Sequence, residues 1–241
     1  MFPINLTDVN PNRRAAANGH GNTCEDRPMS SSAEDLWRGQ SSATRAAERR
    51  ERLLAAGMQL MGTQGSSETT LRGVCREAGV GLRYFYESFA DIDALFVAVH
   101  DSTADALTEA VLAQVATADD AQARGRAAFE AAIEFTSADP RRGRILFQET
   151  LANETLRVHG AQTVPRFVTL VAAALLETTV ADFTADTTHR RELQISALSG
   201  ALVKLFLDWQ SERFGVSREQ LVDYCAELTW AVIGPYRTRP A

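Results

Sequence analysis

Apolar residues recur every three or four positions along most of the chain beyond residue 41. Between residues 43 and 62, Leu53, Leu60 and Met61 follow the period of one helix face. The serine pair just before this segment can cap a helix, and the QGSSET stretch just after it can end one. No segment shows the alternation of apolar and polar residues typical of a half-buried strand, so the pattern predicts an all-α protein.

Two shorter helices are expected next, joined by a turn that contains glycine. The first, residues 70–78, ends at Gly79, because glycine tolerates the left-handed backbone of a helix end. The second has the sequence LRYFYESF and places Leu82, Phe85 and Phe89 on one inward face. Two short helices around a turn of this length predict a helix-turn-helix.

The rest of the chain reads as one helix after another, beginning with a helix that Asp91 can cap. Breaks are expected at Asp139-Pro140, His159-Gly160, Ala185-Asp186 and Gly215. Residues 1–40 are rich in Asn, Gly, Ser, Thr and Pro and have no apolar period, which predicts a disordered extension. Residues 41–90 then form a small N-terminal three-helix domain, and residues 91–241 form a larger helical domain.

Apolar stripes mark the last two predicted helices. Their members are Leu198, Ala201, Leu202 and Leu205 on one helix and Leu221, Cys225, Leu228 and Val232 on the other. Such stripes suit a two-fold interface of four helices in a homodimer, where Ser196, Ser199 and Gly200 would permit close approach. A hairpin buried within one protomer would give the same stripes.

The composition indicates a cell compartment but does not by itself indicate a binding partner. A chain of 241 residues that is 45% hydrophobic can bury a sizeable core. It has no apolar run of membrane-spanning length and no signal peptide, so we expect a cytoplasmic protein without a membrane partner. The net charge is −6, but residues 41–100 carry seven Arg against seven acids. A neutral segment can still contact phosphates, although its charge alone would not indicate DNA.

The sequence contains no recognisable catalytic or metal-binding motif. The three cysteines are far apart, and none forms a CxxC pair, which argues against a disulfide framework or a zinc site. His100, His159 and His189 have no partners at ligand spacing. No phosphate-binding loop or nucleophile motif occurs. We therefore expect neither an enzyme nor a protein with a metal or another cofactor.

Three stretches between Arg52 and Phe96 carry a family pattern, namely RLLAAGMQLMGTQG, TTLRGVCREAGV and GLRYFYESFADIDALF. On these stretches the region from Arg52 to Leu95 resembles the N-terminal DNA-binding region of the TetR family of bacterial repressors, and RYFYESF looks like that of actinobacterial members. In a helix-turn-helix the second helix enters the major groove, where an arginine can donate twice to guanine. An ordinary helical hairpin with an aromatic core is the alternative for this stretch taken by itself.

The resemblance implies a set of residues that contact double-stranded operator DNA. They are Thr70 and Arg72 at the start of the second helix, and Gly81, Leu82, Arg83, Tyr84 and Tyr86 around the third. Gly81 stands where the family often has serine, and Ile92 where many members have a phosphate-binding lysine. Both differences remove attachment to phosphates, so we expect modest DNA affinity with a strong salt dependence.

The family resemblance also implies a function for the larger domain, as a helical regulatory and dimerisation domain with a pocket for a small-molecule effector. Candidate lining residues are Phe96, His100, Phe129, Phe147, Phe167 and Trp209, each of which can equally be core filling. Their character favours an apolar or aromatic effector. The expected protein is a homodimeric repressor that binds a palindromic operator and is released by this effector. The alternative is a small-molecule binding or interaction protein of the same fold with weak or lost DNA binding.

Overall fold

The computed structural model describes residues 31–185 and 189–234, with side chains described from Ser42 onward. The chain divides into two compact units, Met1–Ser42 and Ala43–Ala241. Residues 1–30, which make up most of the predicted disordered extension, lie outside the described residues. Residues 31–40 of that extension are helical, because α1 (Ser31–Gln64) begins twelve positions before the predicted start at Ala43.

All regular elements of the described ranges are helices, as the sequence pattern predicted. After α1 they are α2 (Leu71–Ala78), α3 (Leu82–Ser88), α4 (Ile92–Val115), α5 (Ala121–Ala138), α6 (Pro140–Gly143), the π-helix η1 (Arg144–Glu149), α7 (Thr150–Ala152), α8 (Glu154–Leu175), α9 (Val180–Thr184), α10 (His189–Gln210) and α11 (Arg218–Ile233). None of the helices in the described ranges has the length and apolar character needed to span a membrane.

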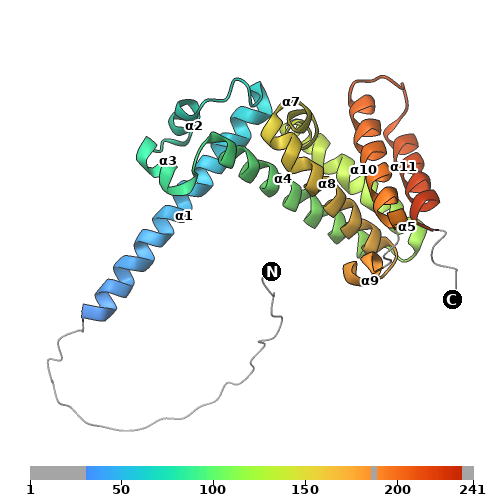
Figure 1. Cartoon of the computed structure of the whole chain (residues 1–241), viewed down its shortest axis with the longest axis horizontal. Coiled ribbons are helices and arrows are strands. Elements are labelled where there is room, and N and C mark those ends of the chain that lie inside the picture. Colours follow the sequence, from blue (N-terminus) through green and yellow to red (C-terminus); the bar gives the residue numbers. More distant parts are fainter. Residues whose placement is uncertain (1–30, 186–188, 235–241) are drawn as a thin grey trace, which may run out of the picture. The chain divides into compact units, whose positions relative to one another are not determined.

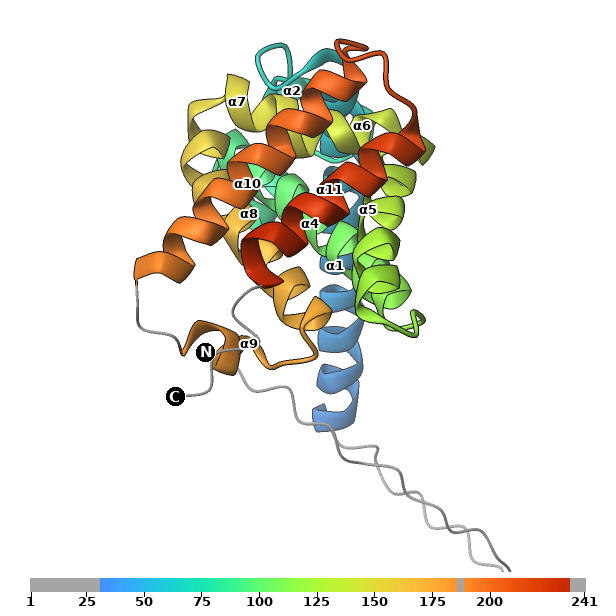
Figure 2. The ribbon, with the colours of Figure 1, turned by 90° about the vertical axis from the view of Figure 1, so that its right-hand side faces the viewer.

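The second unit contains a small N-terminal head and a larger helical bundle (Figure 1). The head is built from α1 after Ala43, α2, α3 and the start of α4 around a core that includes Leu53, Val74 and Phe85. In the bundle, α4 packs against α5 and α8, and α5 packs against α11. Figure 2 shows α10 and α11 side by side on one face of the bundle.

One predicted helix break is wrong. The sequence suggested an interruption at His159-Gly160, but α8 continues through both residues. Gly160 is buried, and an added Cβ there would lie 2.4 Å from Thr150 Cγ2. The glycine therefore permits the close approach of two helices rather than a turn.

Candidate nucleic-acid interface and apolar cavity

Local sequence signals fix the position of α3. The Oγ1 of Thr70 accepts a hydrogen bond from the Gly73 N–H at 3.1 Å and so caps α2. Gly79 ends α2 in the left-handed region, with φ of +61°. Val80 is buried, and Gly81 then serves as the N-cap of α3 without a side-chain hydrogen bond. The result is the short turn of a helix-turn-helix.

The two sides of α3 differ sharply in exposure. Phe85 is 0% exposed, and Phe89 is also buried in the head core. The side chain of Arg83 is 87% exposed, and Tyr86 is 57% exposed. Tyr84 is exposed on the same outer side. The aromatic cluster therefore does two jobs, because two rings anchor the helix and two hydroxyl groups are presented to solvent.

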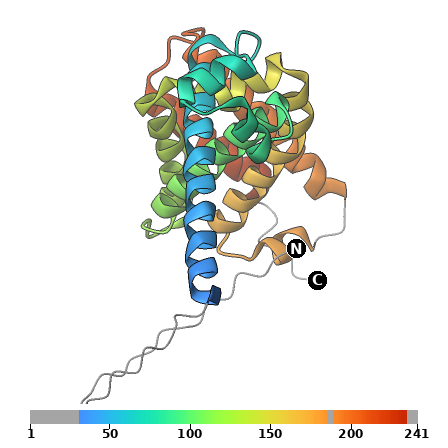
Figure 3. The ribbon, with the colours of Figure 1, turned by 90° about the vertical axis from the view of Figure 1, so that its left-hand side faces the viewer.

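The predicted DNA-contacting residues are all exposed. They are Thr70, Arg72, Gly81, Leu82, Arg83, Tyr84 and Tyr86, and they come from the start of α2 and from α3. Figure 3 is viewed from the side of these helices, drawn in teal and green beside α1. The exposure of Leu82 differs from the prediction, because the helix period placed this side chain on the inward face. It is 47% exposed because it is the first residue of α3 and lies beyond the packed turn.

A carboxylate that was not among the predicted residues, that of Glu87, lies on this surface. Glu87 Oε1 is 3.3 Å from Arg83 Nε, and Glu87 Oε2 is 3.8 Å from Arg49 Nη2. The guanidinium of Arg49 also lies 4.4 Å from the centre of the Tyr84 ring. The spacing of Arg83 and Glu87 by four residues was the available signal. Glu87 lies close to both arginines and offsets part of their positive charge.

A cavity of about 110 Å³ lies between α4, α5, η1, α8, α10 and α11. Its lining includes four of the predicted residues, His100, Phe129, Phe147 and Phe167. The remaining lining is mostly aliphatic and also includes Phe206, which the sequence analysis did not select. A volume of this size has room for roughly five non-hydrogen atoms, because a cavity of about 150 Å³ holds one benzene molecule.

Two predicted lining residues lie elsewhere. Phe96 is buried in the head core, one helical turn before His100 on α4. Trp209 packs in a small cluster of α5, α10 and α11, with its ring centre 6.2 Å from that of Phe206. Phe96 therefore fills the head core and Trp209 is a partly buried residue of another cluster, because the helix period does not report which cluster a residue joins.

Few polar groups face the cavity. The hydroxyls of Thr163 and Ser199 donate to the carbonyls of His159 and Ile195 on their own helices. Cys225 also lines the cavity, and burial raises the pKa of its thiol to about 11. These groups leave a mostly apolar wall that suits an apolar or aromatic molecule.

His100 carries the least satisfied polar atom of the cavity wall. The residue is 1% exposed, and its Nδ1 has no hydrogen-bond partner among the described residues. Burial lowers the pKa of His100, and the nearby His159 adds to this effect while Asp101 opposes it. The ring is therefore neutral near pH 7.

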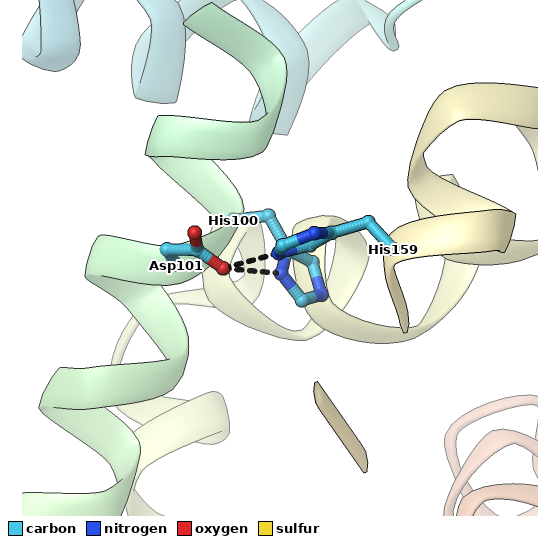
Figure 4. Close-up of side chains that lie close together, drawn as sticks. All are labelled: His100, Asp101 and His159. Carbon is cyan, nitrogen blue, oxygen red and sulfur yellow. Dashed lines mark hydrogen bonds and ion pairs between the residues drawn. The ribbon is translucent and has the colours of Figure 1, made fainter. Parts of the chain in front are cut away.

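Two more potential metal ligands lie beside His100 (Figure 4). Asp101 Oδ1 is 3.6 Å from His100 Nδ1 and 2.5 Å from His159 Nε2, which donates to it. The three ligand atoms all lie within 4.8 Å of one another. No metal site was expected from the sequence, since Asp101 and His159 are far apart along the chain and come together only through the packing of α4 against α8.

A polar network joins the head to the bundle. The buried carboxylate of Glu149 accepts from the N–H and the Oγ–H of Ser66 at 2.8 and 2.7 Å, and from Arg144 Nε at 3.0 Å. Arg144 Nη1 also donates to the carbonyl of Thr63 at 3.0 Å. Both charged residues belong to η1 and hold the end of α1 and the loop that follows it.

The residues of the two predicted dimer stripes differ in how deeply they are buried within the chain. Leu198, Leu221 and Cys225 are buried within it, and Ala201, Leu202, Leu205, Leu228 and Val232 are partly buried. Ser199 is buried as well and lines the cavity. An apolar stripe predicts burial but does not say against what, and here much of it packs on α5 and α8. The outer face of α10 carries Ser196 and Gly200 instead.

Comparison with known proteins agrees with the geometry of the head. The model of a family described as bacterial regulatory proteins, tetR family, matches residues 53–99. No curated protein matches the sequence. The matched segment runs from the head portion of α1 through α2 and α3 into α4.

Solved structures share the fold over most of the chain. The fatty acid degradation regulator FadR from Bacillus halodurans is 15% identical, with a TM-score of 0.59, over 79% of this chain and 97% of its own. The multidrug binding protein EbrR, solved with imidazole, is 22% identical, with a TM-score of 0.55, over 80% and 97%. A TetR-like transcriptional regulator from Rhodococcus sp. RHA1 is 16% identical, with a TM-score of 0.53, over 79% and 97%.

A helix-turn-helix head joined to an all-helical domain is the fold of tetR-family transcriptional regulators. The head matches the model of that family over residues 53–99, and most of the chain shares its fold with a TetR-like transcriptional regulator.

Proposed function

We propose that the protein is a ligand-responsive repressor that binds a palindromic operator as a homodimer and is released by a small apolar or aromatic effector. The observation that carries this proposal is the division of α3 between buried Phe85 and Phe89 and the exposed side chains of Arg83, Tyr84 and Tyr86. A rigidly anchored helix with these outer groups can enter the major groove.

The exposed groups of the head have separate roles in this proposal. Arg83 reads a base, because a guanidinium can donate twice to guanine. Tyr84, Tyr86 and Thr70 position the phosphates. The Oγ1 of Thr70 accepts from the backbone, so its own proton stays available for a phosphate oxygen. Glu87 pairs with Arg83 in the free protein and competes with DNA for it.

The cavity supports an apolar or aromatic effector. Three phenylalanines, Phe129, Phe147 and Phe167, contribute to a wall with few free polar groups. Two proteins of the same fold carry names that fit this chemistry, a fatty acid degradation regulator and a multidrug binding protein. A molecule of roughly five non-hydrogen atoms fits without rearrangement, and a larger one requires the helices to move.

The π-helix η1 is the element through which occupancy of the cavity reaches the head. Leu146 and Phe147 of η1 line the cavity, Ile145 is part of the head core, and Arg144 and Glu149 hold the end of α1. All five residues share six consecutive positions. A ligand that displaces Phe147 must therefore shift the contacts of the other four, and it acts by favouring a conformation that fits the operator poorly.

The outer face of α10 and α11 supports the homodimer. It presents small residues, Ser196, Ala197 and Gly200, together with exposed Leu193 and Tyr224. An added Cβ at Gly200 would meet no described atom within 4 Å, so Gly200→Arg should leave the protomer folded and split the dimer. Light scattering of both proteins at micromolar concentration tests this, and a monomeric wild type would remove the palindrome from the proposal.

The experiment for the DNA function is fluorescence anisotropy with a labelled duplex pool of mixed sequence, at several salt concentrations. Wild type should bind with an affinity that falls steeply with salt. Arg72→Ala should bind more weakly, and its salt slope should be smaller by about the value of one phosphate contact. Arg157→Ala is the matched control, because Arg157 is an exposed arginine of α8 that pairs with Glu154.

Each outcome of this titration separates the candidate functions. No binding at about 0.1 M salt by a folded wild type would favour a small-molecule binding or interaction protein of this fold. Tight binding would contradict the modest affinity expected from Gly81 and Ile92. Equal losses of DNA affinity in Arg72→Ala and Arg157→Ala would show that the DNA-binding site does not lie on the head.

A further inference from the structure

We propose that His100, Asp101 and His159 bind a divalent transition metal ion of the Zn²⁺ class at the wall of the cavity. This inference goes beyond the regulatory function and does not depend on DNA binding. The ligand atoms are His100 Nδ1, a carboxylate oxygen of Asp101 and His159 Nε2, from two neighbouring helices (Figure 4).

The buried and unpartnered Nδ1 of His100 is the first argument. A buried polar atom without a hydrogen bond is uncommon and costs desolvation free energy. The pair formed by Asp101 and His159 explains those two side chains by itself, but it leaves His100 Nδ1 without a partner among the described residues, 3.6 Å from the carboxylate. A metal ion between the three atoms would satisfy all of them.

The distances are close to those of a metal centre. Bonds of about 2.1 Å from a tetrahedral ion place neighbouring ligand atoms roughly 3.4 Å apart. The separation of His100 Nδ1 and Asp101 Oδ1 is 3.6 Å, which already fits. The 2.5 Å between His159 Nε2 and Asp101 Oδ1 is a hydrogen bond that must open. Both of these side chains are partly exposed, so they can move, and the ion takes the place of the shared proton.

The donor set selects the kind of ion. Two imidazole nitrogens and one carboxylate suit Zn²⁺, Co²⁺, Ni²⁺ or Fe²⁺, whereas Mg²⁺ and Ca²⁺ prefer oxygen ligands. Three protein ligands leave at least one coordination position open. Because His100 lines the cavity, water or a donor atom of a cavity ligand can fill that position. The site would thus add one strongly polar contact to a mostly apolar pocket.

The test is equilibrium dialysis of the full-length, tag-free protein against Zn²⁺, with bound metal measured by atomic emission and Co²⁺ absorption as the spectroscopic signature of coordination. Wild type should bind about one ion per chain, and His159→Ala and Asp101→Asn should each weaken binding at least about tenfold. His189→Ala is the matched control, since His189 also lies near a carboxylate, 3.6 Å from Glu192, but is 96% exposed.

Two results would overturn the proposal. One is the absence of stoichiometric binding at about 0.1 mM free Zn²⁺ by folded wild type. The other is binding that His189→Ala removes, or that both His159→Ala and Asp101→Asn leave unchanged. Circular dichroism of each variant establishes that it is folded. His159 and Asp101 are partly exposed, so their replacement should leave the fold intact, and a loss of metal binding can then be assigned to the lost ligand.

Discussion

Replacing Glu149 by Gln is expected to weaken the junction between the head and the bundle. Glu149 is 4% exposed, and its carboxylate accepts three hydrogen bonds, two from Ser66 and one from Arg144. Glutamine has nearly the same size, so the substitution leaves no cavity. It removes the charge and replaces one acceptor oxygen by an NH₂ group that can only donate, which faces either Ser66 or Arg144.

The expected loss of stability follows from these contacts. A hydrogen bond to a charged group contributes about 1.5–3 kcal/mol, compared with about 1 kcal/mol for a neutral one. Removing one partner of a fully buried ion pair costs about 3–5 kcal/mol, but Arg144 is partly exposed and Gln still accepts from one side. We therefore expect Glu149→Gln to lower the free energy of unfolding by about 2–4 kcal/mol.

The pH dependence gives an independent check on the same contacts. Burial by itself would raise the pKa of Glu149, but the hydrogen bonds from Ser66 and Arg144 and the charge of Arg144 outweigh it, so the pKa lies below its ordinary value of 4.5. A lowered pKa means that the stabilisation is present above the unfolded-state pKa and is lost as the pH falls through the folded-state pKa. The advantage of wild type over Glu149→Gln should be constant above about pH 5.5 and shrink below about pH 4.5.

The assay is urea unfolding followed by circular dichroism, at neutral pH and across the acid range. Glu154→Gln is the control, because Glu154 pairs with Arg157 on the surface and its replacement should hardly move the midpoint. Equal midpoints for wild type and Glu149→Gln at neutral pH would refute the reasoning. An advantage of wild type that grows on acidification would refute it as well.

Three further predictions concern the head and the cavity. Phe85→Ala should cost about 3–5 kcal/mol by opening the head core, measured by urea unfolding, and a loss below about 1 kcal/mol would contradict the anchoring role of this ring. Gly81→Ser should stabilise the head by about a few tenths of a kcal/mol and tighten DNA binding, because serine adds a helix cap and a phosphate donor at a position where an added Cβ fits. Weaker DNA binding of this variant in fluorescence anisotropy would contradict the prediction. Burial raises the pKa of Cys225 to about 11, so in the native protein at pH 8 its thiol should react with iodoacetamide about a hundredfold more slowly than in urea. The native reaction should become faster as the pH approaches 11. Rapid labelling of the native protein, measured by peptide mass spectrometry, would contradict the burial of Cys225.

The head was predictable because its signals are local. Thr70 caps α2, Gly79 ends it with positive φ, and Asp91 caps α4 by accepting from the Ala94 N–H at 2.7 Å. Each of these effects depends on residues within a few positions along the chain. The family resemblance rested on the same stretch, which the family model also matches.

The bundle was predictable only in outline, because its site depends on contacts between distant segments. Ser66 meets Glu149, and Asp101 meets His159, through packing that no local pattern reports. The period of α4 predicts that Phe96 and His100 are buried, yet Phe96 joins the head core and His100 the cavity wall.

The most direct test of DNA recognition by α3 is selection of bound sequences from a random duplex library at about 0.1 M salt. Wild type should recover a palindrome, and Arg83→Ala should lose part of that sequence preference, whereas Tyr86→Phe should lower affinity for all sequences alike. The reverse pattern in these two variants would show that their roles are misassigned. Recovery of no preferred sequence by a folded, dimeric wild type would contradict the proposal that the protein is an operator-binding repressor.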